Sequence, residues 1–483
     1  MNTIQAKKFD LNGIMKIKKA ELKQNLATMF YPRSIAIVGS SPDRGKLGYN
    51  ITENLIRFNF PGAIYPINPR YTEIFGLPTY PSLAAIGNHI DLVLCAVGAK
   101  ATIEVARECS MLGVKGLVAY AANFREVGHE GGKLEAALNE IADRTDLTVL
   151  GPNTPGFING NLPLNATFFP FRVQKGNIAV MTQSGGVGGG IYQKALEENM
   201  TIGLWVGVGN RVDLDFSDLL IYLDQDETVD VIGIYMEGTE RGEQFISAAA
   251  RVTSHKPVIL YKAGRTDSAN RLTLSHTGSL SGSPGIYRGL LKQAGVIQVD
   301  SVAELVCACK GLAVAGEPKG ERIGMVTPSG GGSIIVFDLL MEWDCLLPQF
   351  SQNTDKNIRR IMNNTNSVVY KNPLDMTTTG FEAGLYGRVT ETLAMDENID
   401  IIIAIFPIHE YFPPPDDKLI EIRTKVGKPI IVYWIAIDRL NHEYEKRRKV
   451  LEDNGIPVFL LPEEAAWAAR TMAIRSRCMH PSY

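Results

Sequence analysis

His276 stands in a segment of small hydroxylated residues and glycines, Ser-His-Thr-Gly-Ser-Leu-Ser-Gly at 275–282. Such surroundings leave an imidazole exposed, and no Cys, second His or carboxylate stands beside it at metal-ligand spacing. An imidazole of this kind is suited to act as a nucleophile that accepts a phosphoryl group. Taken alone, the segment favours a flexible surface loop that carries one of the seven histidines of the chain, and the rest of the chain reverses that preference.

A carboxylate that can assist this histidine is Glu237, which ends the apolar run 231–236 and precedes Gly238. A side chain at the carboxyl end of a strand points into the crevice of an open α/β sheet. We therefore predict that Glu237 orients the imidazole and stabilises its charged form. By itself, an acid at this position also fits an exposed surface residue.

A glycine-rich turn between a predicted strand and a predicted helix contains Ser184, Gly185 and Gly186. Glycines let the backbone approach an anion closely, and the free N–H groups and dipole of a helix start attract it. No lysine follows, so the turn suits one phosphate or phosphoryl group better than a nucleotide tail. The matching turn at 329–331 has no histidine segment opposite it and is predicted to be only a tight turn.

An earlier glycine turn, at 39–48, also follows a predicted strand and opens a helix, but it matches neither a Walker A loop nor G-x-G-x-x-G. Where a dinucleotide fold places an acid for the ribose diol, this chain has Arg70. An arginine there suits a ribose phosphate, so we predict coenzyme A (CoA) as the ligand; a turn that serves only chain geometry is the alternative. The predicted CoA-binding residues are Gly39, Ser40, Ser41, Arg44, Gly45, Lys46, Asn68, Pro69, Arg70, Ala96 and Val97.

Short apolar runs alternate with helical patterns between residues 34 and 152. The apolar runs lie at 34–38, 63–67, 92–97, 116–119 and 147–150. Continuous apolar strands separated by helices are typical of a parallel sheet covered on both faces. The predicted fold class is therefore α/β, with a Rossmann-like, doubly wound domain that binds its ligand at the carboxyl ends of the strands.

The remainder of the chain contains an internal repeat. Three pairs of segments match in the same order: 178–186 with 323–331, 256–261 with 428–433, and 295–297 with 455–457. We predict two homologous α/β domains, at 168–316 and 320–483, after a Rossmann-like domain at 29–167 and a helical extension at 1–28. The second copy is shorter where the first carries His276, so that segment is dispensable to the fold and is predicted to serve function.

Composition sets further limits. A chain of 483 residues is too long for one compact core, so about three domains are expected. A net charge of −3 gives no support for a nucleic-acid partner, and the apolar stretch 401–408 is too short to cross a bilayer. The six cysteines are scattered, which favours a reduced, cytoplasmic protein. Cys307 and Cys309 fall in a predicted buried helix and are interpreted as core thiols.

Together these residues resemble the α subunit of nucleoside-diphosphate-forming acyl-CoA synthetases, the group that includes ADP-forming acetyl-CoA synthetase. A more distant resemblance is to the succinyl-CoA synthetase α subunit. The resemblance covers nearly the whole chain from residue 30 onward. Its strongest marks lie at 32–34 with 45–48, 65–69, 151–153, 207–210, 236–238, 262–266 and, decisively, 275–280. One departure is Thr154, where the distant relative has cysteine after Gly-Pro-Asn.

The resemblance implies a CoA-binding domain followed by two flavodoxin-like, doubly wound ligase domains. It implies that His276 is a phosphohistidine, that Glu237 supports it, and that the phosphate-binding helix start falls on Ser184 and Gly185. The reaction implied is reversible: a carboxylate, CoA and ATP give acyl-CoA, ADP and phosphate through an acyl phosphate. No metal site is expected in this chain.

The resemblance further implies a partner, an ATP-grasp β subunit in an α2β2 assembly, which would bind most of the ATP or ADP with Mg²⁺. A small carboxylic acid and CoA are the expected substrates, with no nucleic-acid or membrane partner. Two alternatives stay open at this point. One is a non-catalytic CoA- or acyl-CoA-binding regulatory protein of the same fold. The other is an NAD-linked oxidoreductase, against which Arg70 and the missing ribose acid argue.

Overall fold

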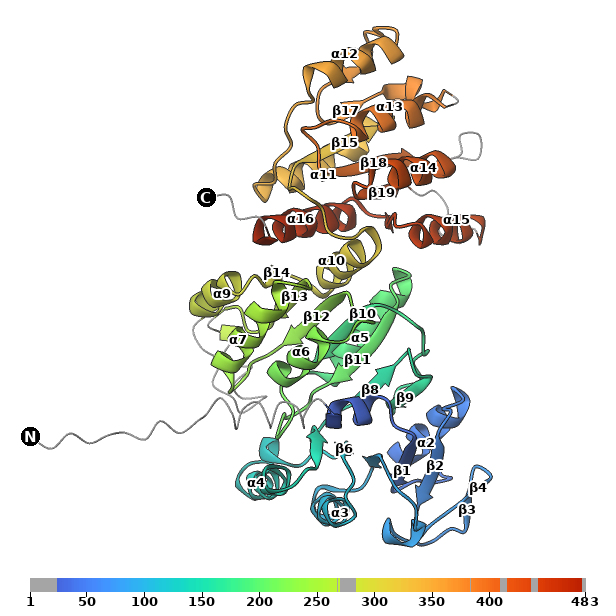
Figure 1. Ribbon diagram of the computed structural model, residues 1–483, viewed down its shortest axis with the longest axis vertical. Helices are drawn as coiled ribbons and strands as arrows, with labels where there is room; N and C mark the ends of the chain where they lie inside the picture. The colour runs from blue at the N-terminus through green and yellow to red at the C-terminus, as the bar shows by residue number, and fades with distance from the viewer. Residues whose placement is uncertain are drawn as a thin grey trace, which may run out of the picture.

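The computed structural model describes residues 24–266, 268–269, 284–382, 384–408, 415–435 and 442–479. Three sheet-based units follow one another along the long axis of the molecule (Figure 1). The α/β fold class predicted from the apolar runs is confirmed. Among the described helices, none combines the length and the apolar character needed to cross a membrane.

The first unit is a five-stranded parallel sheet with the order β2-β1-β5-β6-β7. Its strands are β1 (Ser34–Val38), β2 (Ala63–Ile67), β5 (Leu92–Cys95), β6 (Gly116–Ala119) and β7 (Thr148–Leu150). Its helices are α2 (Leu47–Arg57), α3 (Ala99–Met111) and α4 (His129–Arg144), with a small hairpin of β3 (Glu73–Ile74) and β4 (Leu77–Pro78). The strand order reverses between β1 and β5, which places a ligand crevice at their carboxyl ends.

The second unit is a seven-stranded sheet with the order β14-β13-β12-β10-β11-β8-β9. Its strands are β8 (Gly156–Asn159), β9 (Leu164–Thr167), β10 (Ile178–Thr182), β11 (Ile202–Gly207), β12 (Val231–Met236), β13 (Val258–Lys262) and β14 (Ile297–Val299). Its helices are α5 (Gly185–Glu197), α6 (Phe216–Asp224), α7 (Gly242–Thr253), α9 (Pro284–Gln293) and α10 (Val302–Ala315). The strands from β10 to β14 are mutually parallel, and the hairpin β8–β9 adds antiparallel to β11.

The hairpin β8–β9 precedes the boundary that the sequence predicts between 167 and 168, yet its hydrogen bonds extend the second sheet. The first unit holds the hairpin through side chains. The Tyr120 hydroxyl donates to the Ala166 carbonyl at 2.6 Å, and the Asn54 amide donates to the Thr167 carbonyl at 2.8 Å. The hairpin therefore links the two units rather than closing the first one.

The third unit is a six-stranded sheet with the order β16-β17-β15-β18-β19-β20. Its strands are β15 (Ile323–Thr327), β16 (Val369–Tyr370), β17 (Leu374–Asp375), β18 (Ile401–Pro407), β19 (Ile430–Ile435) and β20 (Val458–Phe459). Its helices are α11 (Gly330–Glu342), α12 (Gln352–Ile361), α13 (Leu385–Ala394), α14 (Asp416–Val426), α15 (His442–Asp453) and α16 (Pro462–Met479). The repeated segments form equivalent strands: β10 corresponds to β15, and β13 to β19.

Residues 1–23 of the predicted N-terminal extension lie outside the described residues. Residues 24–30 form a helical turn whose side chains enter the core of the first two units. Phe30 is fully buried, its ring stands edge-on to Phe157 at 5.1 Å, and its carbonyl accepts a hydrogen bond from the Asn159 amide. This part of the extension is therefore integral to the packing of the hairpin β8–β9.

The second and third units share one hydrophobic core, in which α10 packs against α16. A Cβ on Gly311 would lie 2.9 Å from the Cβ of Ala468, so the two helices approach very closely. Cys307 and Cys309 are buried in this core, which confirms their interpretation as core thiols. Because the helices share a core, the two units are joined by apolar burial and not only by the chain.

A network of buried charges crosses the same interface. The Lys310 ammonium lies 2.5 Å from a Glu452 carboxylate oxygen and also donates to the Val458 carbonyl at 2.7 Å. Arg448 bridges Glu452 at 3.2 Å and Glu198 at 3.0 Å. Burial lowers the pKa of Lys310, and the Glu452 carboxylate opposes that shift. The ammonium is thus retained in the core by carboxylates from both units.

We predict that Lys310→Met lowers the free energy of unfolding by about 3 kcal/mol, because it leaves buried carboxylates without a partner. The control is Lys449→Met, which removes an exposed pair with Asp453 on the same helix as Glu452. Chemical denaturation of both variants measures the difference. Equal stability of the two variants would show that the buried network does not join the units.

Candidate functional site

The turn after β1 needs glycine because it closes onto the end of β5. Gly39 has φ of +88°, and a Cβ there would lie 2.9 Å from both the Ala96 carbonyl oxygen and Val97 Cγ1. A Cβ on Gly48, at the start of α2, would in turn overlap the Gly39 carbonyl. The structure therefore brings the predicted residues Gly39, Ala96 and Val97 together at the point where the strand order reverses.

Asn68 fastens the turn after β2 to this crevice. Its amide donates to the Ser40 carbonyl at 2.7 Å, and its side-chain oxygen accepts from the Arg70 backbone N–H at 3.0 Å. Ser40 is buried and its hydroxyl hydrogen-bonds the Thr52 hydroxyl at 2.8 Å. The exposed Arg70, in the turn after β2, is thereby held beside the glycine turn that follows the neighbouring strand β1.

The other two predicted cations are both exposed but differ in what holds them. Arg44 donates from Nε to the Tyr49 hydroxyl at 3.2 Å. Lys46 forms an ion pair with Asp43 at 2.5 Å, a contact within the turn that the sequence analysis missed. A surface pair of this kind is weak because both groups are solvated, so a phosphate can compete with Asp43 for the ammonium.

Thr154, which stands where the distant relative has cysteine, connects two of the segments that carry the family resemblance. Its hydroxyl donates to the Gly207 carbonyl and accepts from the Gly156 N–H. The residue is buried, so its hydroxyl is committed to holding the segment 151–153 against the segment 207–210. Thr154 therefore holds the backbone around the site in place.

The turn after β10 begins helix α5. Ser184 is its N-cap, and the hydroxyl accepts from the Val187 N–H at 3.4 Å. A Cβ on Gly186 would meet nothing within 4 Å, so the helix start is open on that side. The first N–H groups of a helix have no partner inside it and favour an anion.

The equivalent helix start in the third unit is different. An oxygen of the Asp375 carboxylate lies 2.5 Å from the position a Cβ on Gly330 would take, at the start of α11. The other oxygen accepts from the Thr377 N–H at 2.9 Å. A carboxylate at this helix start repels a phosphate, which agrees with the prediction that the second copy is only a tight turn.

Glu237 follows β12 directly and is buried beside the turn after β10. The side-chain oxygen of Gln183 accepts from the backbone N–H groups of Glu237 and Gly238, at 2.9 and 3.1 Å. The Tyr235 hydroxyl donates to the Glu237 carboxylate at 3.3 Å. The structure therefore brings Glu237 and Ser184 to the same edge of the sheet. Gln183 stands inside the predicted turn, but its role depends on a partner far along the chain.

Lys262 is a further polar residue at this edge that the sequence analysis assigned no role. Its ammonium donates to the backbone carbonyls of Glu237 and Ala263, both at 2.6 Å, and lies 5.2 Å from the centre of the Tyr287 ring. Burial lowers the pKa of Lys262 to about 8, against the opposing effect of Glu237. The sequence signal that could have identified Lys262 is a lysine at the end of an apolar strand.

His276 lies outside the described residues, so its predicted contact with Glu237 stays a prediction. Lys262 precedes the segment and Tyr287 follows it, and these two side chains are in contact. The described parts of the chain on either side of the segment are therefore close together. Both flanks stand at the edge of the sheet that carries Glu237. Within the described ranges, no group of three His, Cys, Asp or Glu residues is arranged to hold a metal ion.

Comparison with known proteins matches both parts of this site. The family model for a CoA binding domain matches residues 33–160, and that for a succinyl-CoA ligase like flavodoxin domain matches residues 175–312. The Pyrococcus furiosus acetate–CoA ligase (ADP-forming) II subunit alpha is 36% identical over 93% of this chain and 97% of that protein. The Archaeoglobus fulgidus acetate–CoA ligase (ADP-forming) I is 34% identical over 93% of this chain, which spans 63% of that longer protein.

A solved structure extends the likeness to three dimensions. The dinucleotide-forming acetyl-coenzyme A synthetase 1 of Candidatus Korarchaeum cryptofilum, in complex with phosphate and ADP, superposes with a TM-score of 0.85. The match covers 94% of this chain and 97% of that chain, at 32% identity. The order of all three units is therefore common to both proteins.

We predict that Lys262 loses its proton near pH 8, whereas exposed lysines do so near pH 10.4. The folded-state pKa is lowered, so the neutral amine accumulates as the pH rises through 8. Competitive acetylation across pH 7 to 11, read by mass spectrometry, follows each amine. Glu237→Gln should lower the pKa of Lys262 further, because it removes the carboxylate that raises it. A Lys262 profile that coincides with that of exposed Lys449 would contradict this prediction.

Proposed function

We propose that this chain, which belongs to the family of ADP-forming acetate–CoA ligase α subunits, reversibly couples a carboxylate, CoA and ATP to acyl-CoA, ADP and phosphate. The observation that carries the proposal is the meeting of Glu237 with the open helix start at Ser184, at the sheet edge that also carries Lys262, the last residue of the strand before His276. Similarity to ligases over almost the whole chain favours this activity over a non-catalytic CoA-binding regulator or an oxidoreductase.

The proposed chemistry has three steps. A nitrogen of His276 attacks the γ-phosphorus of ATP, and ADP leaves. A carboxylate oxygen of the acid then attacks the phosphohistidine, which gives an acyl phosphate and frees the imidazole. Finally the CoA sulfur attacks the acyl carbon, and phosphate leaves. Dividing the reaction in this way lets the histidine carry the phosphoryl group between separate sites.

Each described residue has a proposed task in these steps. Glu237 accepts a hydrogen bond from one ring nitrogen, so that the other is free to attack. The helix start at Ser184, Gly185 and Gly186 binds the phosphoryl oxygens through backbone N–H groups. Lys262 holds the backbone of Glu237 in place and supplies positive charge when protonated.

CoA is proposed to bind the first unit, with its phosphates at the glycine turn and Arg70. The turn is open to solvent on the side of Gly45, where a Cβ would meet nothing within 4 Å. Arg44 and Lys46 add charge on the same turn. The scattered, mostly buried cysteines fit a reducing compartment, and we propose the cytoplasm as the location.

An ATP-grasp β subunit is the proposed partner, in an α2β2 assembly, and would bind most of the ATP or ADP and Mg²⁺. Two facts support it. The Pyrococcus furiosus relative that this chain spans almost fully is named a subunit alpha. The Archaeoglobus fulgidus relative is longer, and this chain spans 63% of it.

We predict that CoA binds the purified chain more tightly than NAD, and that Arg70→Ala weakens CoA binding about 10-fold or more, as expected for a lost charge-assisted hydrogen bond. Isothermal titration calorimetry measures both. Arg107→Ala is the control, since Arg107 is exposed on α3 and pairs with Glu104 of the same helix. Tighter binding of NAD, or equal affinities of the two variants, would refute the placement of CoA.

We predict that ATP labelled in its γ-phosphate transfers an acid-labile label to this chain when the partner subunit is present. His276→Ala should abolish the label and the overall reaction while CoA binding persists. Glu237→Gln should slow labelling by about 10²-fold to 10⁴-fold, the range for a positioned proton-transfer group. Glu243→Gln, exposed on α7, is the control. Label that remains in His276→Ala would rule out the phosphohistidine.

A further inference from the structure

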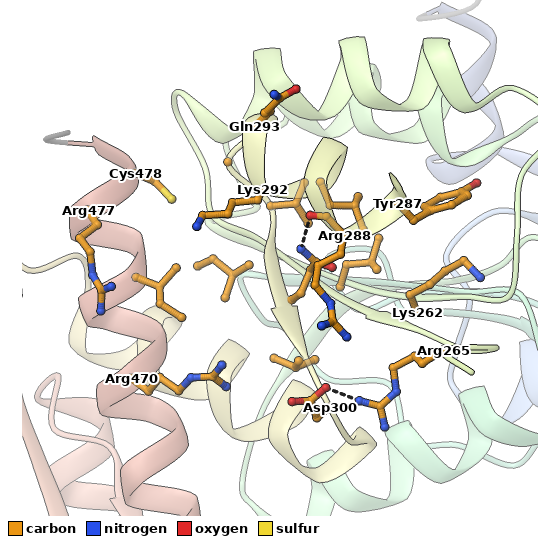
Figure 2. Close-up of a pocket in the computed structure, with 18 of the residues that line it drawn as sticks. Lys262, Arg265, Tyr287, Arg288, Lys292, Gln293, Asp300, Arg470, Arg477 and Cys478 are labelled. Carbon is orange, nitrogen blue, oxygen red and sulfur yellow. Dashed lines mark hydrogen bonds and ion pairs between the residues drawn. The ribbon is translucent and has the colours of Figure 1, made fainter. Parts of the chain in front are cut away.

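A cleft of about 680 Å³ separates the edge of the second unit from helix α16 of the third. The second unit contributes strand β14 and the end of α9, and the third contributes one face of α16 with Trp343 (Figure 2). The CoA crevice does not include this cleft. Among the described residues, the cleft shares Lys262 and Tyr287 with the proposed phosphoryl-transfer site, and the Lys262 ammonium points away from α16 toward Tyr287 (Figure 2).

The cleft is strongly cationic. Its lining includes Lys262, Arg265, Arg288, Lys292, Arg470 and Arg477, and among the described residues Asp300 is the one carboxylate that lines it. Asp300 pairs with Arg265, while Glu304 and Glu321, behind the wall, pair with Arg470 and Arg477. Three cations are thus compensated by three carboxylates, and the remaining positive charge faces the cleft.

The uncompensated charge lies mainly on α9. Arg288 and Lys292 are exposed and one helical turn apart, and no carboxylate in the described part of the chain pairs with either side chain. Figure 2 shows Lys292 directed toward α16, with Arg288 between the two walls. Two cations at i and i+4 repel each other, so an anion bound between them relieves an unfavourable interaction.

The opposite wall is preorganised. The Arg470 guanidinium is held by Glu304, which is buried, at 2.6 Å, and lies 5.0 Å from the centre of the Trp343 ring. A guanidinium fixed at one nitrogen retains donors on the others, and its planar fork matches two oxygens of a phosphate. Apolar side chains such as Leu291 and Ile474 line the rest of the space and fit an organic moiety.

We propose that this cleft binds an organic polyphosphate, a small molecule with at least two negative charges and a less polar body, which bridges the second and third units. Two or more phosphates match the pair Arg288 and Lys292 on one wall and Arg470 on the other. A ligand held by both walls stabilises the arrangement in which they face each other, because it binds that arrangement best. Apart from Lys262, the residues named for this cleft have no task in the proposed reaction, so the occupant is assigned as an effector and not as a substrate of that reaction.

The test is calorimetry of the purified full-length chain with inorganic pyrophosphate, and then with ADP, at low salt. Wild type should bind pyrophosphate saturably. Arg288→Glu/Lys292→Glu should weaken binding at least 10-fold. The matched control is Lys356→Glu/Arg360→Glu, which makes the same charge change at i and i+4 of α12, outside the cleft. The less polar body predicts that ADP binds more tightly than pyrophosphate and that the α9 variant loses this binding too.

Pyrophosphate can also meet the glycine turn of the first unit, so Arg70→Ala is titrated in parallel. Binding lost in Arg70→Ala but kept in the α9 variant would place the anion at the CoA crevice and overturn the proposal. So would an equal loss in the α12 control, or no saturable binding by wild type. Tighter binding of pyrophosphate than of ADP would contradict the proposal that the ligand has a less polar organic body. These outcomes are independent of histidine labelling, so the proposed ligase activity and the cleft can fail separately.

Discussion

The carboxamide oxygen of Gln183 accepts hydrogen bonds from two consecutive backbone N–H groups, those of Glu237 and Gly238. These bonds join the turn after β10 to the turn after β12, at the carboxyl edge of two parallel strands. Ser184 follows Gln183 directly, so the same interaction sets the open helix start beside the Glu237 carboxylate. The proposed phosphoryl chemistry depends on this juxtaposition, since an anion-binding helix start and a hydrogen-bond acceptor must face one reacting group.

The two flavodoxin-like units show how one architecture supports different local chemistry. Both contain a strand that ends in a glycine turn and a helix, and both align the equivalent strands in parallel. In the second unit the helix start is open beside Gly186, whereas in the third Asp375 places a carboxylate there. The difference arises from one side chain on a neighbouring strand, and it decides whether the turn attracts or repels an anion.

The contact between these units combines a shared apolar core with buried and half-buried charge. Close packing of α10 on α16 excludes water, and this strengthens the pairing of Lys310 with Glu452 of the third unit. At the rim of the same contact the units part, and the cationic cleft lies there. The charges that are paired inside the interface therefore adjoin the cations at its edge that have no carboxylate partner among the described residues.

Local pattern predicted much of this molecule. The runs at 34–38 and 116–119 are strands with the same bounds, the repeated segments form equivalent strands, and Glu237 and Ser184 stand at strand ends as expected. These features follow from the chain itself, because burial on both faces demands continuous apolar residues and a helix start demands its own capping residue.

Other features depend on groups far apart in the sequence. The hairpin β8–β9 pairs with β11 of the second sheet, while Tyr120 and Asn54 of the first unit hold its backbone from the other side. Gln183 and Lys262 acquire their roles from the distant carbonyl and N–H groups that they reach. The cationic cleft requires α9 and α16, which come from different units, to face each other. Periodicity reports which face of an element is buried; it does not report which partner covers that face, since the partner is set by packing of the whole chain.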